Sequence, residues 1–217
     1  DIALIDGQQR TLAMMVGWAG LSQALRPVAL WVDVAEAPQG EYRFRLCVTT
    51  GSQPFGYEKA SAGGEKLAKL TREKLRQVNR VWREQDQKAQ LDAHTLWATP
   101  GFMPWESTLA LLLPEVVACR DEEALRALVA ARRQAKVDWL KAKLADIDKQ
   151  AADKQGQELN FLKAVRVQLE KRLAAIESAT GDAVNQRVKA LIAARDKVKA
   201  SQFPVIQVRE AHFASEV

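Results

Sequence analysis

The residues best suited to chemistry in this sequence stand together near its start. Asp6, Gly7, Gln8, Gln9 and Arg10 follow a short apolar run and precede a segment with helical spacing. A strand that ends in Asp-Gly and leads into a helix leaves free backbone N–H groups at the helix N-terminus, where the helix dipole also favours negative charge. Phosphate is the natural ligand of such a turn.

The side chains of this turn extend the same chemistry. Arg10 offers a forked, permanently charged partner for phosphate oxygens. Gln8 and Gln9 carry amides that can orient a water molecule or contact a base or ribose, and Asp6 can hold a magnesium ion through water. We therefore take Asp6, Gln8, Gln9 and Arg10 as candidate catalytic residues and, together with Gly7, as candidate nucleotide-binding residues. The direct ligands of a metal stay unknown.

A plainer interpretation of the turn prevails on physical grounds alone. Asp6 would be a helix N-cap, Gly7 would allow a tight turn, and the glutamines and Arg10 would be ordinary polar helix residues. The sequence also holds no G-x-x-x-x-G-K-[ST] phosphate loop, so any triphosphatase chemistry would be of a different kind. The chemistry of these residues by itself leaves both interpretations open.

The remaining candidates are weaker. His94 and His212 are more readily explained as surface or packing residues than as catalytic bases. Trp97, Phe102 and Trp105 could stack on an extruded base, but hydrophobic packing under a helical lid is the commoner use of such residues.

The elements expected to position the turn are strands near both ends of the chain with helices between them. Short apolar or β-branched runs predict strands at 2–5, 28–34, 42–49 and 203–208. A helix is expected at 11–25, and a polar helix from about 65 to 90. We expect the strands at 28–34 and 42–49 to be adjacent.

The second half of the chain has the pattern of packed helices. Apolar residues recur at steps of three and four in two stripes: Val137, Leu140, Leu144 and Ile147, and then Leu162, Val165, Leu169, Leu173 and Ile176. Gln155-Gly156 between them predicts a reversal, so the stripes should form an antiparallel hairpin. A third helix is expected at 184–198.

These elements predict an α/β (α+β) fold with a large helical insertion or cap that includes the antiparallel hairpin. We expect the α/β core with the turn at 1–60, a connecting helix and a Trp- and Pro-rich segment at 61–120, the helical bundle at 121–200, and a returning core strand at 201–217. The chain opens on Asp1 inside an apolar pattern, so we expect it to be a piece of a longer protein.

Composition bounds the function without choosing it. Hydrophobic residues at 47% and charged residues at 27% are typical of a folded protein. A net charge of +5 favours contact with polyanions, although the basic residues alternate with acidic ones as on a solvated helix surface. Cys47 and Cys119 predict neither a disulfide framework nor a zinc site, and no apolar run reaches the roughly 20 residues of a membrane span. We expect a cytoplasmic protein with no membrane partner.

A family resemblance follows from the turn and its surroundings. Residues 4–12, Leu-Ile-Asp-Gly-Gln-Gln-Arg-Thr-Leu, resemble the signature of the DGQQR-motif family of phage-defence proteins, which includes the GmrS-like and SspE-like N-terminal domains of the ParB/sulfiredoxin-like superfamily. The stretches 30–33 and 44–50 are similar to that family's next two strands. Family members usually continue Arg-Leu-Thr-Thr-Leu, where this chain reads Arg10-Thr11-Leu12-Ala13. Residues 121–200 correspond only to a variable helical region.

The resemblance implies a ParB/sulfiredoxin-like core that binds or hydrolyses a nucleoside triphosphate, GTP or another, together with Mg. Hydrolysis at residues 6–10 would gate restriction of invading, often modified, phage DNA. The implied partners are this DNA and a nuclease domain or subunit, because the family's HNH-type cutting module is usually separate. Two rivals stay open: a ParB-like DNA-binding adaptor without hydrolysis, and a helical interaction module whose stripes pair with a partner or with a second copy of the chain.

Overall fold

The computed structural model describes residues 28–36, 44–50, 52–58, 68–83, 104–179 and 181–200. Several sequence predictions fall outside these ranges, and they stay predictions: the candidate site Asp6, Gly7, Gln8, Gln9 and Arg10, the strands at 2–5 and 203–208, the helix at 11–25, and the side chains His94, Trp97, Phe102 and His212. The described part combines a small antiparallel sheet with five helices, which confirms the α+β class.

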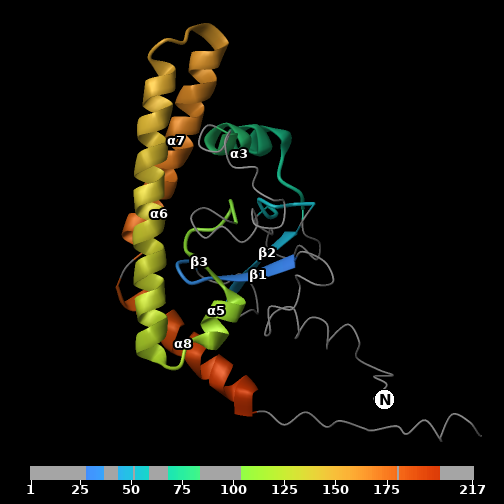
Figure 1. The fold of residues 1–217 in the computed structure, drawn as a ribbon, viewed down its shortest axis with the longest axis vertical. Helices are drawn as coiled ribbons and strands as arrows, with labels where there is room; N and C mark the ends of the chain where they lie inside the picture. Colours follow the sequence, from blue (N-terminus) through green and yellow to red (C-terminus); the bar gives the residue numbers. More distant parts are fainter. Residues whose placement is uncertain are drawn as a thin grey trace, which may run out of the picture.

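The sheet has three strands in the order β2-β1-β3, all antiparallel (Figure 1). The central strand β1 (Val28–Asp33) pairs along its whole length with β2 (Arg45–Thr50). β3 (Ala110–Leu112) pairs with the second half of β1. The predicted adjacency of the first two strands is therefore confirmed, whereas β3 comes from a stretch whose short apolar run carried no strand prediction.

The strand β1 is held by its aromatic residue as well as by the ladder. Trp31 is fully buried, and its Nε1 donates a hydrogen bond of 2.9 Å to the Oγ1 of Thr49 on β2. A buried indole N–H needs such a partner, because an unpaired buried donor is costly. The Trp31–Thr49 hydrogen bond thus supports the register of β1 and β2 on the buried face of the sheet.

Helix α3 (Arg72–Arg83) begins later than the predicted start near residue 65. Lys69 instead forms an isolated β-bridge with Tyr57, and Thr71 acts as the N-cap, since its Oγ1 accepts from the Lys74 backbone N–H at 3.4 Å. A hydroxyl that satisfies a free N–H is a standard helix start. At its other end α3 contacts the helical hairpin, where the Arg80 Nε donates to Gln150 at 3.1 Å.

The helical part begins with the short α5 (Leu113–Ala118), which has a proline in its first turn. The long helices α6 (Glu122–Ala151) and α7 (Gly156–Ser178) follow as the predicted antiparallel hairpin (Figure 1). The reversal falls at the predicted place, where Gly156 has a φ of +60°, a backbone conformation that glycine adopts at little cost. Helix α8 (Asp182–Ala200) is the predicted third helix.

The sheet and the helices share one hydrophobic core. It runs from Trp31 and Val32 through Leu109 and Leu111 to the seam between α6 and α7. Helix α8 is tied to the end of β1, because Arg187 donates to the backbone oxygens of Val34 and Ala35 at 3.2 and 2.9 Å. None of the helices in the described ranges combines the length and apolar character that a membrane span requires.

Candidate functional site

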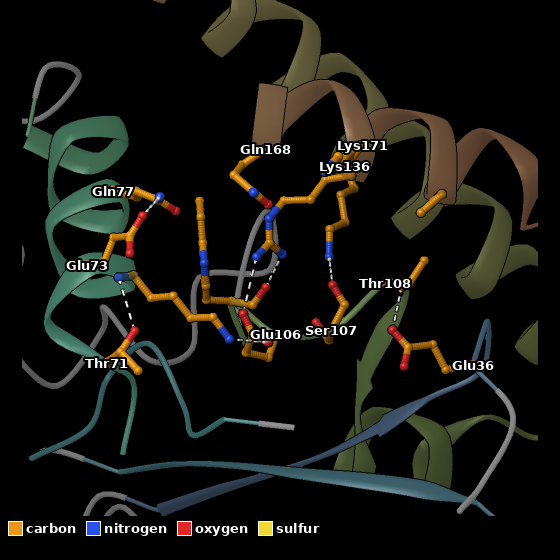
Figure 2. A pocket seen from close by; sticks show the side chains of 14 residues that line it. Glu36, Thr71, Glu73, Gln77, Glu106, Ser107, Thr108, Lys136, Gln168 and Lys171 are labelled. Atoms are coloured by element: carbon orange, nitrogen blue, oxygen red, sulfur yellow. Dashed lines mark hydrogen bonds and ion pairs between the residues drawn. The ribbon is translucent and has the colours of Figure 1, made fainter. Parts of the chain in front are cut away.

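A cleft of about 410 Å³ lies above the sheet, between α3 on one side and α6 and α7 on the other. Figure 2 shows Glu73 and Gln77 reaching into it from α3, and Lys136 and Gln168 from the opposite wall. The segment 104–108 forms its floor. Its charged lining residues are Glu36, Glu73, Glu106, Lys74, Lys136, Lys171 and Arg172. The volume is in the range of small-molecule sites, roughly 300–1,000 Å³.

The floor of the cleft is fixed to the sheet by a buried carboxylate. Asp33, at the end of β1, is 1% exposed, and its Oδ2 accepts from the Thr108 backbone N–H at 2.6 Å. Its Oδ1 accepts from the backbone N–H groups of Leu109 and Ala35 at 3.1 and 3.0 Å. These bonds use the acceptor capacity of Asp33, so this residue positions the segment and is not free to bind a ligand.

The loop 52–58 supports the floor from below. The backbone N–H of Trp105 donates to the Phe55 oxygen at 2.9 Å. Gly56 has a φ of +86°, and a Cβ on it would lie 3.0 Å from the Cβ of Pro104. Both the backbone conformation and the close approach require glycine here.

The two inner carboxylates of the cleft are already neutralised. Glu106 accepts from the Lys74 Nζ at 3.1 Å and from the Arg172 Nη2 at 3.4 Å. Glu36 accepts from the Thr108 Oγ1 at 2.6 Å and also binds Arg45. Lys74 has a second partner in Glu58, which lies beside the start of α3.

Lys136 is the most deeply buried cation of the cleft, at 6% exposure. Its Nζ donates to the Ser107 backbone oxygen at 3.0 Å, and among the described residues no carboxylate lies within salt-bridge distance. Burial, together with the nearby positive charge of Arg172, lowers the pKa of Lys136 to about 8, although the negative charges of Asp33 and Glu36 and the thiol of Cys47 oppose the change. A substantial fraction of this amine is therefore charged at neutral pH.

Arg172 on α7 lines the same wall of the cleft as Lys136, and its charge acts on the Lys136 amine. Its guanidinium lies over the Trp105 ring, 4.0 Å from the centroid, and donates to the Trp105 backbone oxygen. Its Nε is buried and has no hydrogen-bond partner within the described part of the chain. Burial also lowers the pKa of Arg172, although an arginine stays charged. The fold thus holds this guanidinium in place but leaves its donors partly unused.

Trp105 is the one member of the predicted aromatic set that the structure describes. It is 3% exposed, and Arg172 covers its ring. Of the two roles considered from the sequence, base stacking and packing, this environment favours packing.

The site residues proposed from the sequence, Asp6 to Arg10, lie outside the described ranges, and the sequence did not single out Lys136 or Arg172. Both were grouped with a solvated helix surface, which is wrong for Lys136, because it is buried. A signal was present: Lys136 stands four residues before Leu140, and Arg172 stands three residues after Leu169. Each therefore lies on or beside the buried stripe of its helix.

The described residues of this cleft do not form a metal centre. Within the described ranges, no group of three His, Cys, Asp or Glu side chains is arranged to hold a metal ion. Comparison of the chain with protein-family models, curated proteins and solved structures finds no match.

Proposed function

We propose that this chain is a nucleotide-binding and nucleotide-hydrolysing sensor of a bacterial anti-phage DNA restriction system of the modification-dependent type, built on a ParB/sulfiredoxin-like core. The observation that carries the proposal is the run Asp6 to Arg10, placed between an apolar run and a helical pattern. Support comes from β1 and β2, which pair where the family resemblance expects the next two strands.

The roles of the turn follow from its chemistry. Arg10 and the free backbone N–H groups beginning at Gly7 bind the phosphates of GTP or another nucleoside triphosphate. Gln8 and Gln9 orient the attacking water, and Asp6 holds Mg through water. Hydrolysis then gates a nuclease that acts on phage DNA, and this nuclease belongs to another domain or subunit.

The test compares Arg10→Ala with the unchanged chain for nucleotide affinity, by calorimetry, and for phosphate release. Loss of a charge-assisted phosphate contact should weaken binding by about 10-fold or more and abolish turnover. Arg120→Ala is the matched control, because this arginine has an 83% exposed side chain outside the cleft. Normal affinity and turnover in Arg10→Ala would refute the site.

A DNA-binding adaptor without hydrolysis is the second candidate, favoured by the net charge of +5. In that case the turn faces the phosphates of the DNA backbone. DNA binding would fall steeply with salt and would not respond to any nucleotide. A binding assay across salt concentrations, with and without GTP or ATP, separates the two candidates.

A further inference from the structure

We propose that the cleft between α3, α6 and α7 is a separate binding site for a phosphate-bearing small molecule, whose oxyanion is held between Lys136 and Arg172. The described cleft alone carries this inference, which goes beyond the turn at residues 6–10, so the two proposals can fail separately. The class of ligand follows from hydrogen-bond donors in the cleft that have no partner among the described residues.

Several N–H donors of the cleft have no hydrogen-bond acceptor among the described residues. Lys136 has three N–H donors and uses one, on the Ser107 backbone oxygen, within the described residues. Arg172 has an unused Nε, and its bond to Glu106 is long at 3.4 Å. Lys171, next along α7, is exposed and makes no hydrogen bond or ion pair with any described residue.

The acceptors of the cleft cannot serve these donors. Both oxygens of Glu106 are bound by Lys74 and Arg172, and Glu36 is bound by Thr108 and Arg45. Asp33 is occupied by backbone N–H groups. The remaining carboxylate, Glu73, lies exposed on α3 and accepts a weak bond of 3.5 Å from Gln77. A ligand that completes this set must bring several acceptor oxygens and negative charge.

A phosphate group has this chemistry, because it offers three or more acceptor oxygens and pairs well with a guanidinium and an ammonium. The cleft, at about 410 Å³, has room for more than a bare ion. The amides of Gln77 and Gln168 on its walls are available to contact the rest of a phosphorylated small molecule.

Stability alone does not explain these cations. Lys136 lies on the face of α6 that also buries Leu125, Val129, Leu140 and Ile147, where an apolar residue would pack without cost of desolvation. The fold keeps a charged amine there without a carboxylate partner among the described residues. Buried charge that lacks compensation in a cleft is a feature of binding sites.

The experiment uses pyrophosphate and inorganic phosphate as probes, with the full chain at pH 7 and low salt, by isothermal titration calorimetry. It is run in the Arg10→Ala background, which silences the turn, as well as in the unchanged chain. We expect both to bind pyrophosphate. Lys136→Met and Arg172→Met should each lose at least about 10-fold in affinity, and Lys171→Ala a few-fold. Glu73→Gln should bind pyrophosphate more tightly, because it removes a negative charge that repels the anionic ligand.

Two variants guard against trivial loss of structure. Lys141→Met, on α6 but with a 59% exposed side chain, should bind as the unchanged chain does. Lys136→Arg keeps the charge and should retain binding within a few-fold. Unaltered pyrophosphate affinity in both Lys171→Ala and a folded Lys136→Met would overturn the inference. So would complete loss of binding in Arg10→Ala alone, which would leave the proposed function standing.

Discussion

The hairpin of α6 and α7 has two regions that differ in what they bury. Near the reversal its seam is mainly apolar, with Leu140, Ile147, Leu162 and Leu169 all at 0–1% exposure. Closer to the sheet the same two helices present Lys136 and Arg172 to a cleft. The difference indicates that the apolar seam holds the two helices together. The part that lines the cleft is less favourable for stability, because it buries charged side chains.

The apolar region is not wholly free of charge. Lys143 is 2% exposed within it, and its Nζ lies 5.8 Å from the centroid of the Trp139 ring. A long side chain of this kind can bury its stem along apolar surface and keep its ammonium beside an aromatic face. The contrast is therefore between a seam that tolerates a cation and a cleft that is lined with several.

The largest expected effect lies in the apolar region. Leu169→Ala removes a fully buried side chain from the seam and should lower the free energy of unfolding by about 2–5 kcal/mol, through lost burial and the cavity left behind. Urea denaturation followed by circular dichroism measures it. Val167→Ala, whose side chain is exposed on the same helix, should change stability by less than about 0.5 kcal/mol. Equal effects would show that the seam does not hold the hairpin.

In the cleft region, raising the pH should increase the stability of the chain, because Lys136 is buried there as a charged amine. The folded-state pKa of Lys136 is about 8, against an ordinary value of 10.5. Below pH 8 both states are protonated, and the fold bears the full cost of the buried charge. Between pH 8 and 10.5 the unfolded state binds more protons, so the stability of the wild-type chain rises relative to Lys136→Met, by about 3 kcal/mol in total.

Urea unfolding of the wild-type chain and Lys136→Met at pH 7, 8, 9 and 10 measures this difference. The comparison cancels the titration of the other lysines, because both proteins share them. If the two stability curves stay parallel across this range, Lys136 is not buried as a charged amine, and the distinction between the two regions loses its main support.

One glycine in each region, Gly56 under the cleft and Gly156 at the hairpin reversal, allows a comparison with smaller expected effects on stability. Gly56→Ala under the cleft combines a left-handed backbone with a 3.0 Å approach to Pro104, so it should cost about 2 kcal/mol and weaken any ligand bound above it. Gly156→Ala at the reversal has the left-handed backbone but no atom within 4 Å, and should cost about 1 kcal/mol. Thermal unfolding ranks the two, and the reverse order would place the tighter backbone constraint at the hairpin.

The smallest expected effect is on ligand affinity. Pyrophosphate binding to the cleft should weaken several-fold from pH 7 to pH 9, because the amine of Lys136, whose pKa is about 8, loses its proton in this range. Calorimetry at the two pH values measures it in the Arg10→Ala background. Lys136→Arg, which stays charged, is the control, and it should show little change. If the Arg10→Ala chain with Lys136 intact binds pyrophosphate equally well at both pH values, Lys136 is not part of the site.

Local pattern was enough to predict much of the described fold. The apolar runs of β1 and β2, the stripes of α6 and α7 and the glycine at position 156 each act within a few residues, and the structure has each of them in place. The start of α3 was predicted too early, because Lys69 pairs with Tyr57 across the chain. The strand β3 escaped prediction for a similar reason, since three residues become a strand only by pairing with β1.

The sequence by itself determined the class of fold, the hairpin and the run Asp6 to Arg10 as the feature that suggests nucleotide chemistry. Only the tertiary structure decided that Lys136 and Arg172 line a cleft. Their burial depends on the end of β1, the loop 52–58 and the segment 104–108 meeting beneath two helices. From the sequence alone a lysine on a helix is expected to be exposed, because most lysines are. Its burial depends on segments that are distant along the chain and so cannot be predicted from local pattern.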